Sequence, residues 1–203
     1  MMAAIHETAY PKLDASFKDQ ELAELFTPTQ KELNFVKNRI PDIAGRLNLL
    51  TLLKVFQHLG YFPMRTAIPP AISKFHANCL GYLFQVDITD TYDQSGARSR
   101  HIKFIRSFLD VKPITEQTYS CMKQAAFDAA QTEEHLADII NVMIEELVRQ
   151  HFELPAFSRF NREAIKARAR VNENCFEVVN NQLSSIHQEQ LDQWLEQKTE
   201  EET

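Results

Sequence analysis

The stretch YDQSGARSRHIKFIRSFLDVK, residues 92–112, carries the pattern that decides the predicted fold of this chain. On a helix at 100° per residue, its apolar side chains gather on one side and its basic side chains on the other. Ser95 and Gly96 form a turn signal that can begin this helix. The apolar side is formed by Ile102, Ile105, Phe108 and Leu109, and the basic side by Arg100, Lys103 and Arg106.

A helix of this kind, with one positive face that also carries small hydroxyls, suits contact with a phosphate backbone. A surface helix whose basic side is only solvated explains the same pattern, and from this stretch alone it is the simpler interpretation.

The same amphipathic pattern recurs along the chain and predicts an all-α fold. The 203 residues include only 4 Gly, and apolar residues seldom alternate as they would in strands. Caps and breakers bound the helices: Thr29 with Glu32, Asp42 before Gly60, and Pro70 before Gly81. The predicted helices are 17–26, 29–37, 42–60, 71–80, the basic helix after Gly96, 116–131, 133–150, 158–180 and 184–195.

These helices group into two predicted subdomains, 26–112 and 113–197, each with one basic helix in a helix-turn-helix-like arrangement. Residues 1–25 are expected to be an N-terminal lead-in, and residues 198–203 a charged, frayed tail. The second basic helix has an apolar stripe formed by Phe160, Ala164, Ala167, Val171, Cys175 and Val178. Arg159, Arg162, Lys166 and Arg170 form a band away from that stripe.

The net charge of −6 conceals two basic blocks in an acidic chain. Residues 37–112 carry 11 basic and 5 acidic groups, and residues 159–170 carry 5 and 1. The segments around them are acidic: residues 113–158 carry 2 basic and 8 acidic groups, and residues 171–203 carry 1 and 8. Because DNA responds to the local field within about 10 Å at moderate salt, the blocks matter more than the total.

Other chemistry finds little support in the sequence. Asp87, Asp90 and Asp93 lie in a turn-prone segment and fit loop and cap roles better than a metal site. No pair of histidines has metal-ligand spacing, and neither a phosphate loop nor a nucleophile elbow is present. No apolar run is long enough for a membrane span, and the three cysteines are expected to be reduced. The expectation is a cytoplasmic protein without cofactor or metal.

Four segments, taken in order, bear a resemblance to a known family. They are GRLNLL at 45–50 with Gly60, PPAISKFHA at 69–77, YDQSG at 92–96 with His101, Ile105, Arg106 and Leu109, and LPAF at 154–157 with Arg162 and Ala167 to Ala169. Over residues 26–196 the chain resembles the N-terminal region of the Tn-three family of replicative, cointegrate-forming bacterial transposases. Gly45, Asn48, Gln94 and Ala97 depart from that family's pattern, so its base preference does not transfer.

The resemblance implies an all-helical module that binds double-stranded DNA and recognises the terminal inverted repeats of a transposon. In that family catalysis belongs to an RNase H-like domain further along, so no enzymatic activity is expected from this chain alone. The chain would then be an excised domain or a truncated product, with transposon DNA, the rest of a transposase and a second copy as expected partners. The candidate DNA-binding residues are Arg39, Arg46, Arg98, Arg100, His101, Lys103, Arg106, Arg159, Arg162, Lys166, Arg168 and Arg170.

Two of these candidates, and the function itself, have alternative interpretations. His101 falls in the apolar arc of its helix and is equally well explained as a buried, hydrogen-bonded histidine. Arg46 can instead fix its helix to an acidic neighbour. The whole chain can also be a protein-interaction module whose basic helices dock on a transposase or another partner, without DNA specificity of its own.

Overall fold

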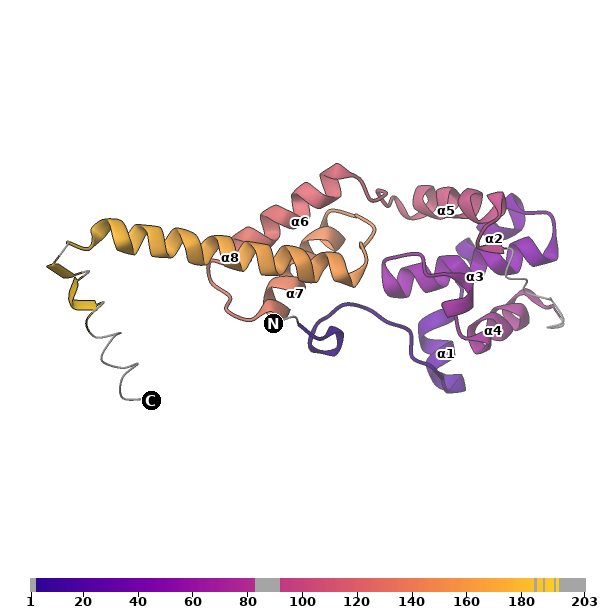
Figure 1. Cartoon of the computed structure of the whole chain (residues 1–203). Coiled ribbons are helices and arrows are strands. Elements are labelled where there is room, and N and C mark those ends of the chain that lie inside the picture. Colours follow the sequence, from indigo (N-terminus) through magenta and orange to yellow (C-terminus); the bar gives the residue numbers. More distant parts are fainter. Residues whose placement is uncertain (1–2, 83–91, 185, 188, 192, 194–203) are drawn as a thin grey trace.

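The computed structural model describes residues 3–82, 92–184, 186, 187, 189–191 and 193 (Figure 1). Over these residues the predicted all-α fold is confirmed: none forms a strand, and Lys112 and Phe152 make an isolated β-bridge. The helices are α1 Asp19–Phe26, α2 Gln30–Arg39, α3 Ile43–Leu59, α4 Pro70–Leu80, α5 Gly96–Leu109, α6 Glu116–Ala129, α7 Leu136–Arg149 and α8 Phe157–Gln182, with short 3-10 turns at Ile5–Glu7 and Arg65–Ala67.

Most predicted helix boundaries follow from local capping. Thr29 and Glu32 form the expected capping box, with the Glu32 backbone N–H donating to Thr29 Oγ1 over 3.3 Å. Asp42 accepts from the Gly45 N–H at 2.6 Å and begins α3. Gly60 ends that helix in the left-handed region, at φ 71°.

Several boundaries differ from the sequence prediction. Helix α1 begins at Asp19 instead of residue 17, α2 ends at Arg39 instead of residue 37, and α8 ends at Gln182 instead of residue 180. The helix predicted from residue 133 begins only at Leu136 as α7, and the Thr132 hydroxyl before it donates to the Ala129 carbonyl at the end of α6. Helix α6 ends at Ala129 instead of residue 131, and α8 begins at Phe157, with Ser158 inside the helix. For the last predicted helix, the described residues between 186 and 193 are helical, whereas residues 185 and 195 lie outside the described residues.

Helix α3 is the centre of the first helical unit, α1 to α5. Its residues are buried on nearly all sides, including the polar Thr51 and Lys54. On one side, Leu50 and Leu53 share a core with Val36 of α2, Ala77 of α4 and Ile105 of α5. On another side, Val55 and Leu59 share a second core with Leu22 and Phe26 of α1 and Ile72 of α4.

Two buried polar groups attach neighbouring helices to α3. The carboxylate of Glu32 on α2 accepts from Gln57 Nε2 at 2.7 Å and lies 3.5 Å from Lys54 Nζ. Burial alone would raise the pKa of Glu32, but the hydrogen bonds from Thr29 and Gln57 and the charge of Lys54 outweigh it and lower the pKa. His76 of α4 lies between the Thr51 hydroxyl and the Phe26 carbonyl, 3.1 Å from each.

The second unit is a three-helix bundle of α6, α7 and the first half of α8. Its core is built from Met122 of α6, Ile139, Ile140 and Met143 of α7, and Phe160 and Ala164 of α8. The predicted apolar stripe of α8 is covered only as far as Val171, since Cys175 and Val178 are exposed. Figure 1 shows the second half of α8 projecting away from the bundle.

The N-terminal segment, residues 3–12, packs across the second unit before the chain enters the first. Ala3 exchanges two hydrogen bonds of 3.0 Å with the side chain of Asn161, and Ala9 donates to Asn141 at 2.7 Å. Tyr10 is buried, and its hydroxyl donates to the Pro155 carbonyl at 3.0 Å. The Tyr10 ring also stacks on that of Tyr61, which follows α3, with the centroids 5.5 Å apart. These residues, expected to be a lead-in, therefore contact both units.

The two units also meet directly where α3 ends. The Leu154 N–H donates to the Gly60 carbonyl at 2.8 Å, and a Cβ on Gly60 would lie 3.0 Å from the Leu154 side chain. Lys112, between α5 and α6, bonds through its backbone to His151 and Glu153 at 2.8 and 3.0 Å. We call this contact, formed by Gly60, Lys112 and residues 151–154, the joint.

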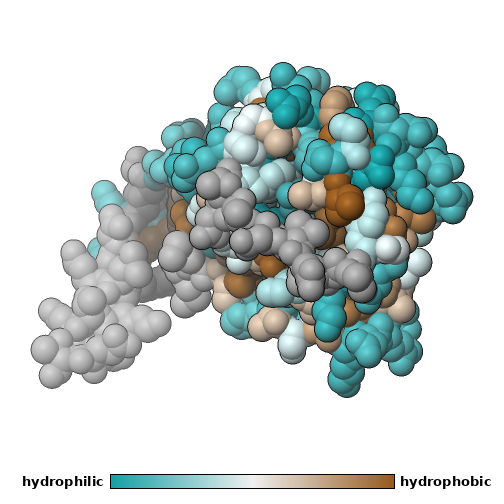
Figure 2. All heavy atoms as spheres, turned by 90° about the vertical axis from the view of Figure 1, so that its right-hand side faces the viewer, coloured by the Kyte–Doolittle hydropathy of each residue, from teal (hydrophilic) through white to brown (hydrophobic). Residues whose placement is uncertain are grey.

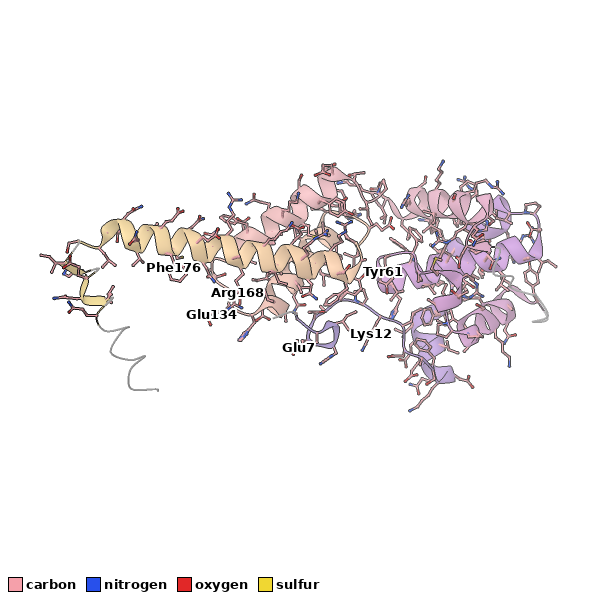
Figure 3. All side chains as sticks on the ribbon, viewed as in Figure 1. Glu7, Lys12, Tyr61, Glu134, Arg168 and Phe176 are labelled. Carbon is pink, nitrogen blue, oxygen red and sulfur yellow. The ribbon has the colours of Figure 1, made fainter. Side chains whose placement is uncertain are left out.

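Replacing Tyr10 tests the role of the N-terminal segment in stability. We expect Tyr10→Ala to lower the free energy of unfolding by about 3–5 kcal/mol, because a buried ring and its hydrogen bond are lost. Lys12→Ala, at an exposed position of the same segment (Figure 3), should change it by less than about 0.5 kcal/mol. Urea unfolding of both variants measures the difference, and equal stability would contradict the packing role.

Two buried histidines predict how stability depends on pH. Burial lowers the pKa of His76 to about 4, and burial together with the nearby charge of Arg100 lowers the pKa of His101 to about 4. Because the unfolded chain binds these protons below about pH 6.5, stability should fall as the pH drops from 6.5 towards 4, by about 2–3 kcal/mol per histidine at pH 4.5. Urea titrations from pH 8 to 4.5 measure the free energy of unfolding, and the parent chain and the exposed-site control His187→Gln should lose it equally. A free energy of unfolding that does not change with pH would contradict the prediction.

Candidate nucleic-acid interface

A cluster of polar side chains fixes the start of α5 and uses two of the candidate DNA-binding residues. The buried imidazole of His101 has its Nδ1 2.7 Å from the Tyr92 hydroxyl. Arg98 pairs with Asp93 at 3.1 Å and donates to the carbonyls of residues 62 and 63. Asp93 also accepts from the Arg65 N–H at 2.6 Å. Of its two interpretations, His101 therefore fits the buried, hydrogen-bonded histidine. The side chain of Arg98 is engaged by Asp93 and two backbone carbonyls.

Two more candidates are held in structural contacts. Arg106 pairs with Glu153 of the joint, with Nε 3.1 Å from Oε2, and its guanidinium lies 5.6 Å from the Phe62 ring centroid. Arg46 donates to the Ile40 carbonyl at 2.6 Å and to the Tyr82 hydroxyl at 3.3 Å. Arg46 therefore binds backbone oxygen at the end of α2 and the hydroxyl of Tyr82 after α4, where an acidic partner is the alternative from the sequence.

The remaining cations of α5 lie beside two cations of α2. Arg100 and Lys103 are exposed, and neither side chain has an ion pair or hydrogen bond to any residue that the structure describes. From α2, Arg39 lies 5.2 Å from the Phe104 ring and Lys31 lies 5.5 Å from the Phe108 ring, both rings belonging to α5. We call these four residues the α5 surface.

A stacked pair of rings joins the two helices of the α5 surface. Phe35 of α2 and Phe108 of α5 stack with their centroids 4.2 Å apart, and Arg39 also lies over Phe35 at 5.8 Å. Figure 2, which faces this end of the molecule, shows hydrophilic side chains over much of the surface with hydrophobic patches between them. The ring pair gives the α5 surface a rigid base.

The second group of cations lies between α6 and α8. Lys123, Phe127, Glu163, Lys166, Ala167 and Arg170 line a hollow of about 330 Å³, which we call the α6–α8 hollow. The guanidinium of Arg170 lies 5.1 Å from the Phe127 ring. Glu163, the acidic member, is 3.6 Å from both Lys166 and Arg162. Three cations against one carboxylate leave the hollow positive.

The other basic residues of α8 divide between two sides of the helix. The guanidinium of Arg159 lies 5.8 Å from the ring of Tyr119 on α6, the helix that also lines the α6–α8 hollow. Arg168 lines a different hollow together with Glu7 and Asp138. In Figure 3 it lies on the side of α8 towards the N-terminal segment and Glu7. Arg168 therefore lines an acidic hollow and is not part of the positive α6–α8 hollow.

Sequence reasoning missed two residues of these surfaces, Lys31 and Lys123. Lys31 carries a signal, since it shares a helix face with Phe35 and Arg39 at spacings of four. Lys123 carries none, because only the packing of α6 on α8 brings it to Lys166 and Arg170.

The described residues hold no cluster of three or more His, Cys, Asp or Glu that could bind a metal ion. Asp93 is engaged with Arg65 and Arg98, and Asp87 and Asp90 lie outside the described residues. Of the helices described, none combines the length and apolar character needed to cross a membrane.

A protein-family model described as a domain of unknown function, DUF4158, matches residues 1–167. The chain belongs to the DUF4158 family. The DUF4158 match covers α1 to α7 and ends at Ala167, the last buried residue of α8, so it includes both units and the joint. Comparison with curated proteins finds no match.

Substitutions should separate structural from free arginines. Arg106→Ala leaves the nearly buried Glu153 carboxylate without its partner and should cost about 1–3 kcal/mol of unfolding free energy. Arg100→Ala, on the same helix, should change it by less than about 0.5 kcal/mol. Thermal or urea unfolding measures both, and a similar cost for the two variants would contradict these assignments.

Proposed function

We propose that this chain binds double-stranded DNA in a sequence-specific manner, as the N-terminal module of a transposase that recognises transposon terminal inverted repeats. The observation that carries the proposal is the presence of two positive surfaces, one on each helical unit, in a chain with a net charge of −6. The transposase assignment rests on the resemblance of the four sequence segments.

The α5 surface supports DNA contact by its composition and exposure. Arg39 and Arg100 present planar guanidinium groups, which can pair with guanine in a bidentate manner, whereas Lys31 and Lys103 suit phosphates. The opposite face of α5 is anchored by the buried Ile105, so the exposed face is held in a fixed orientation. A helix with these properties can enter a major groove, as the second helix of a helix-turn-helix does.

The α6–α8 hollow suits contact with the DNA backbone. Lys123, Lys166 and Arg170 bring three positive charges from two helices to one site, which suits the negative charge of neighbouring phosphates. Because the N-terminal segment and the joint fasten the units together, binding by one surface raises the effective concentration of the other.

The salt dependence of binding tests the electrostatic part of this function. With roughly five phosphate contacts, the slope of log K against log salt on random duplex should be steeper than about −4. Lys166→Ala should weaken binding to all duplexes evenly and reduce the slope by about 1, and Lys123→Ala should do the same. Arg168→Ala, at the acidic hollow, is the matched control and should leave the slope unchanged.

Specificity is tested by gel shift against terminal-repeat DNA and random duplex. Arg100→Ala and Arg39→Ala should cost about 1–3 kcal/mol on the preferred site if each reads a base, and less on random duplex. Two results would instead favour a protein-interaction module. One is a slope of log K against log salt near zero, and the other is specific binding by folded Arg100→Ala and Arg39→Ala that equals that of the parent chain.

A further inference from the structure

A groove runs between α6 and α7 on a side of the bundle that α8 does not cover. Its volume is about 650 Å³, and its lining residues repeat at three- and four-residue steps on both helices. On α6 they extend from Gln117 to Asp128, about 16 Å at 1.5 Å per residue. The groove therefore has the length of three helical turns, and it lies where a fourth helix would complete a four-helix bundle.

The groove has a shallow apolar floor and an acidic rim. Cys121 and Ala125 of α6, Val142 of α7 and Phe152 form the floor, and the small side chains on α6 allow close approach of another helix. The rim carries Asp128, Glu145 and Glu146.

Among the described residues, two carboxylates of the rim differ in their partners, since Glu146 is paired with an arginine and Glu145 is not. Arg149 donates to Glu146 at 2.7 and 2.8 Å, and these bonds, with one from Gln150, lower the pKa of Glu146 to about 2. Glu145 is exposed and has no ion pair with any residue that the structure describes. One arginine against three carboxylates leaves the groove negative.

Helix α6 separates this groove from the positive α6–α8 hollow. Gln117, Cys121 and Asp128 lie on one face of α6 and Lys123 and Phe127 on another, and at 100° per residue the mean directions of the two groups differ by about 120°. Opposite charges on two faces of one helix indicate two different partners. A negative groove repels DNA, so its occupant is not the duplex.

We propose that the α6–α7 groove docks a basic amphipathic helix of a protein partner. The apolar stripe of that helix covers the floor, and its Lys or Arg side chains reach Asp128 and Glu145 on the two sides. Helix-in-groove recognition with apolar anchors at i, i+3, i+4 and i+7 fits the length and the lining of the groove. This inference does not depend on DNA binding.

The test uses the full chain and a synthetic 14-residue helical peptide with a Leu/Ala stripe flanked by Lys, and a counterpart with Glu in place of Lys. The Lys peptide should shift the amide NMR signals of residues 117–128 and 142–150, and the Glu peptide should bind at least about tenfold more weakly. Ser120→Trp fills the groove from an exposed rim position without changing charge, and should weaken binding at least about tenfold. Gln124→Trp gives the same test at a second position.

Charge reversal provides the matched control. Asp128→Lys with Glu145→Lys should abolish peptide binding, whereas Glu133→Lys with Glu134→Lys, exposed in the turn between α6 and α7, should leave it within about twofold. Three results would overturn the proposal: an equal loss of peptide affinity in the two charge-reversed variants, full peptide affinity in both Trp variants, and unchanged amide NMR signals in the groove. So would a self-association in sedimentation experiments that Ser120→Trp abolishes, since the occupant would then be a second copy. DNA binding by Gln124→Trp, which points further from Lys123, should be unchanged, and this separates the inference from the proposed function.

Discussion

The structure depends on the burial of α3. This helix is apolar around most of its circumference, and at about 25 cal/mol per Å² of buried apolar surface it cannot be left in water. Helices α1, α2, α4 and α5 cover it. Its few buried polar groups fix how two of them pack, because Lys54 forms an ion pair with Glu32 of α2 and Thr51 a hydrogen bond with His76 of α4. The orientation of α5, and with it that of the α5 surface, follows from this packing.

The end of α3 also determines where the second unit sits. Gly60 ends the helix with a positive φ, which favours glycine, and a Cβ there would lie 3.0 Å from the Leu154 side chain, tighter than an ordinary contact. Arg106 and Glu153 add an ion pair across the same contact, and Tyr10 stacks on Tyr61 with ring centroids 5.5 Å apart. Several of the residues that carry the transposase resemblance, among them Tyr92, His101, Arg106 and Leu154, belong to these structural contacts. The exposed cations proposed to contact DNA lie mostly outside those segments, which gives a physical reason why base preference need not follow the resemblance.

Charge is separated by helix faces, so the net charge of −6 describes no single surface of the molecule. Helix α6 has a positive hollow on the side of α8 and a negative groove on the side of α7. These fields act over about one Debye length, roughly 8–10 Å, which is close to the width of a helix. The anionic and cationic partners proposed above would therefore bind different faces of the same bundle.

The sequence by itself determined the fold class and most helix ends, because Thr29, Asp42, Gly60 and Ser95 act on the backbone within four residues of themselves. It also determined which face of α5 is apolar. Only the tertiary structure decided which cations remain free. Arg106 is a basic-face residue by periodicity, yet Glu153 engages it, and Arg98, a candidate for DNA contact, is engaged by the carbonyls of residues 62 and 63. Lys123 joins Lys166 only through the packing of two helices. Helical periodicity records the direction of a side chain, whereas its partner depends on segments far away in the chain, which the local pattern does not contain.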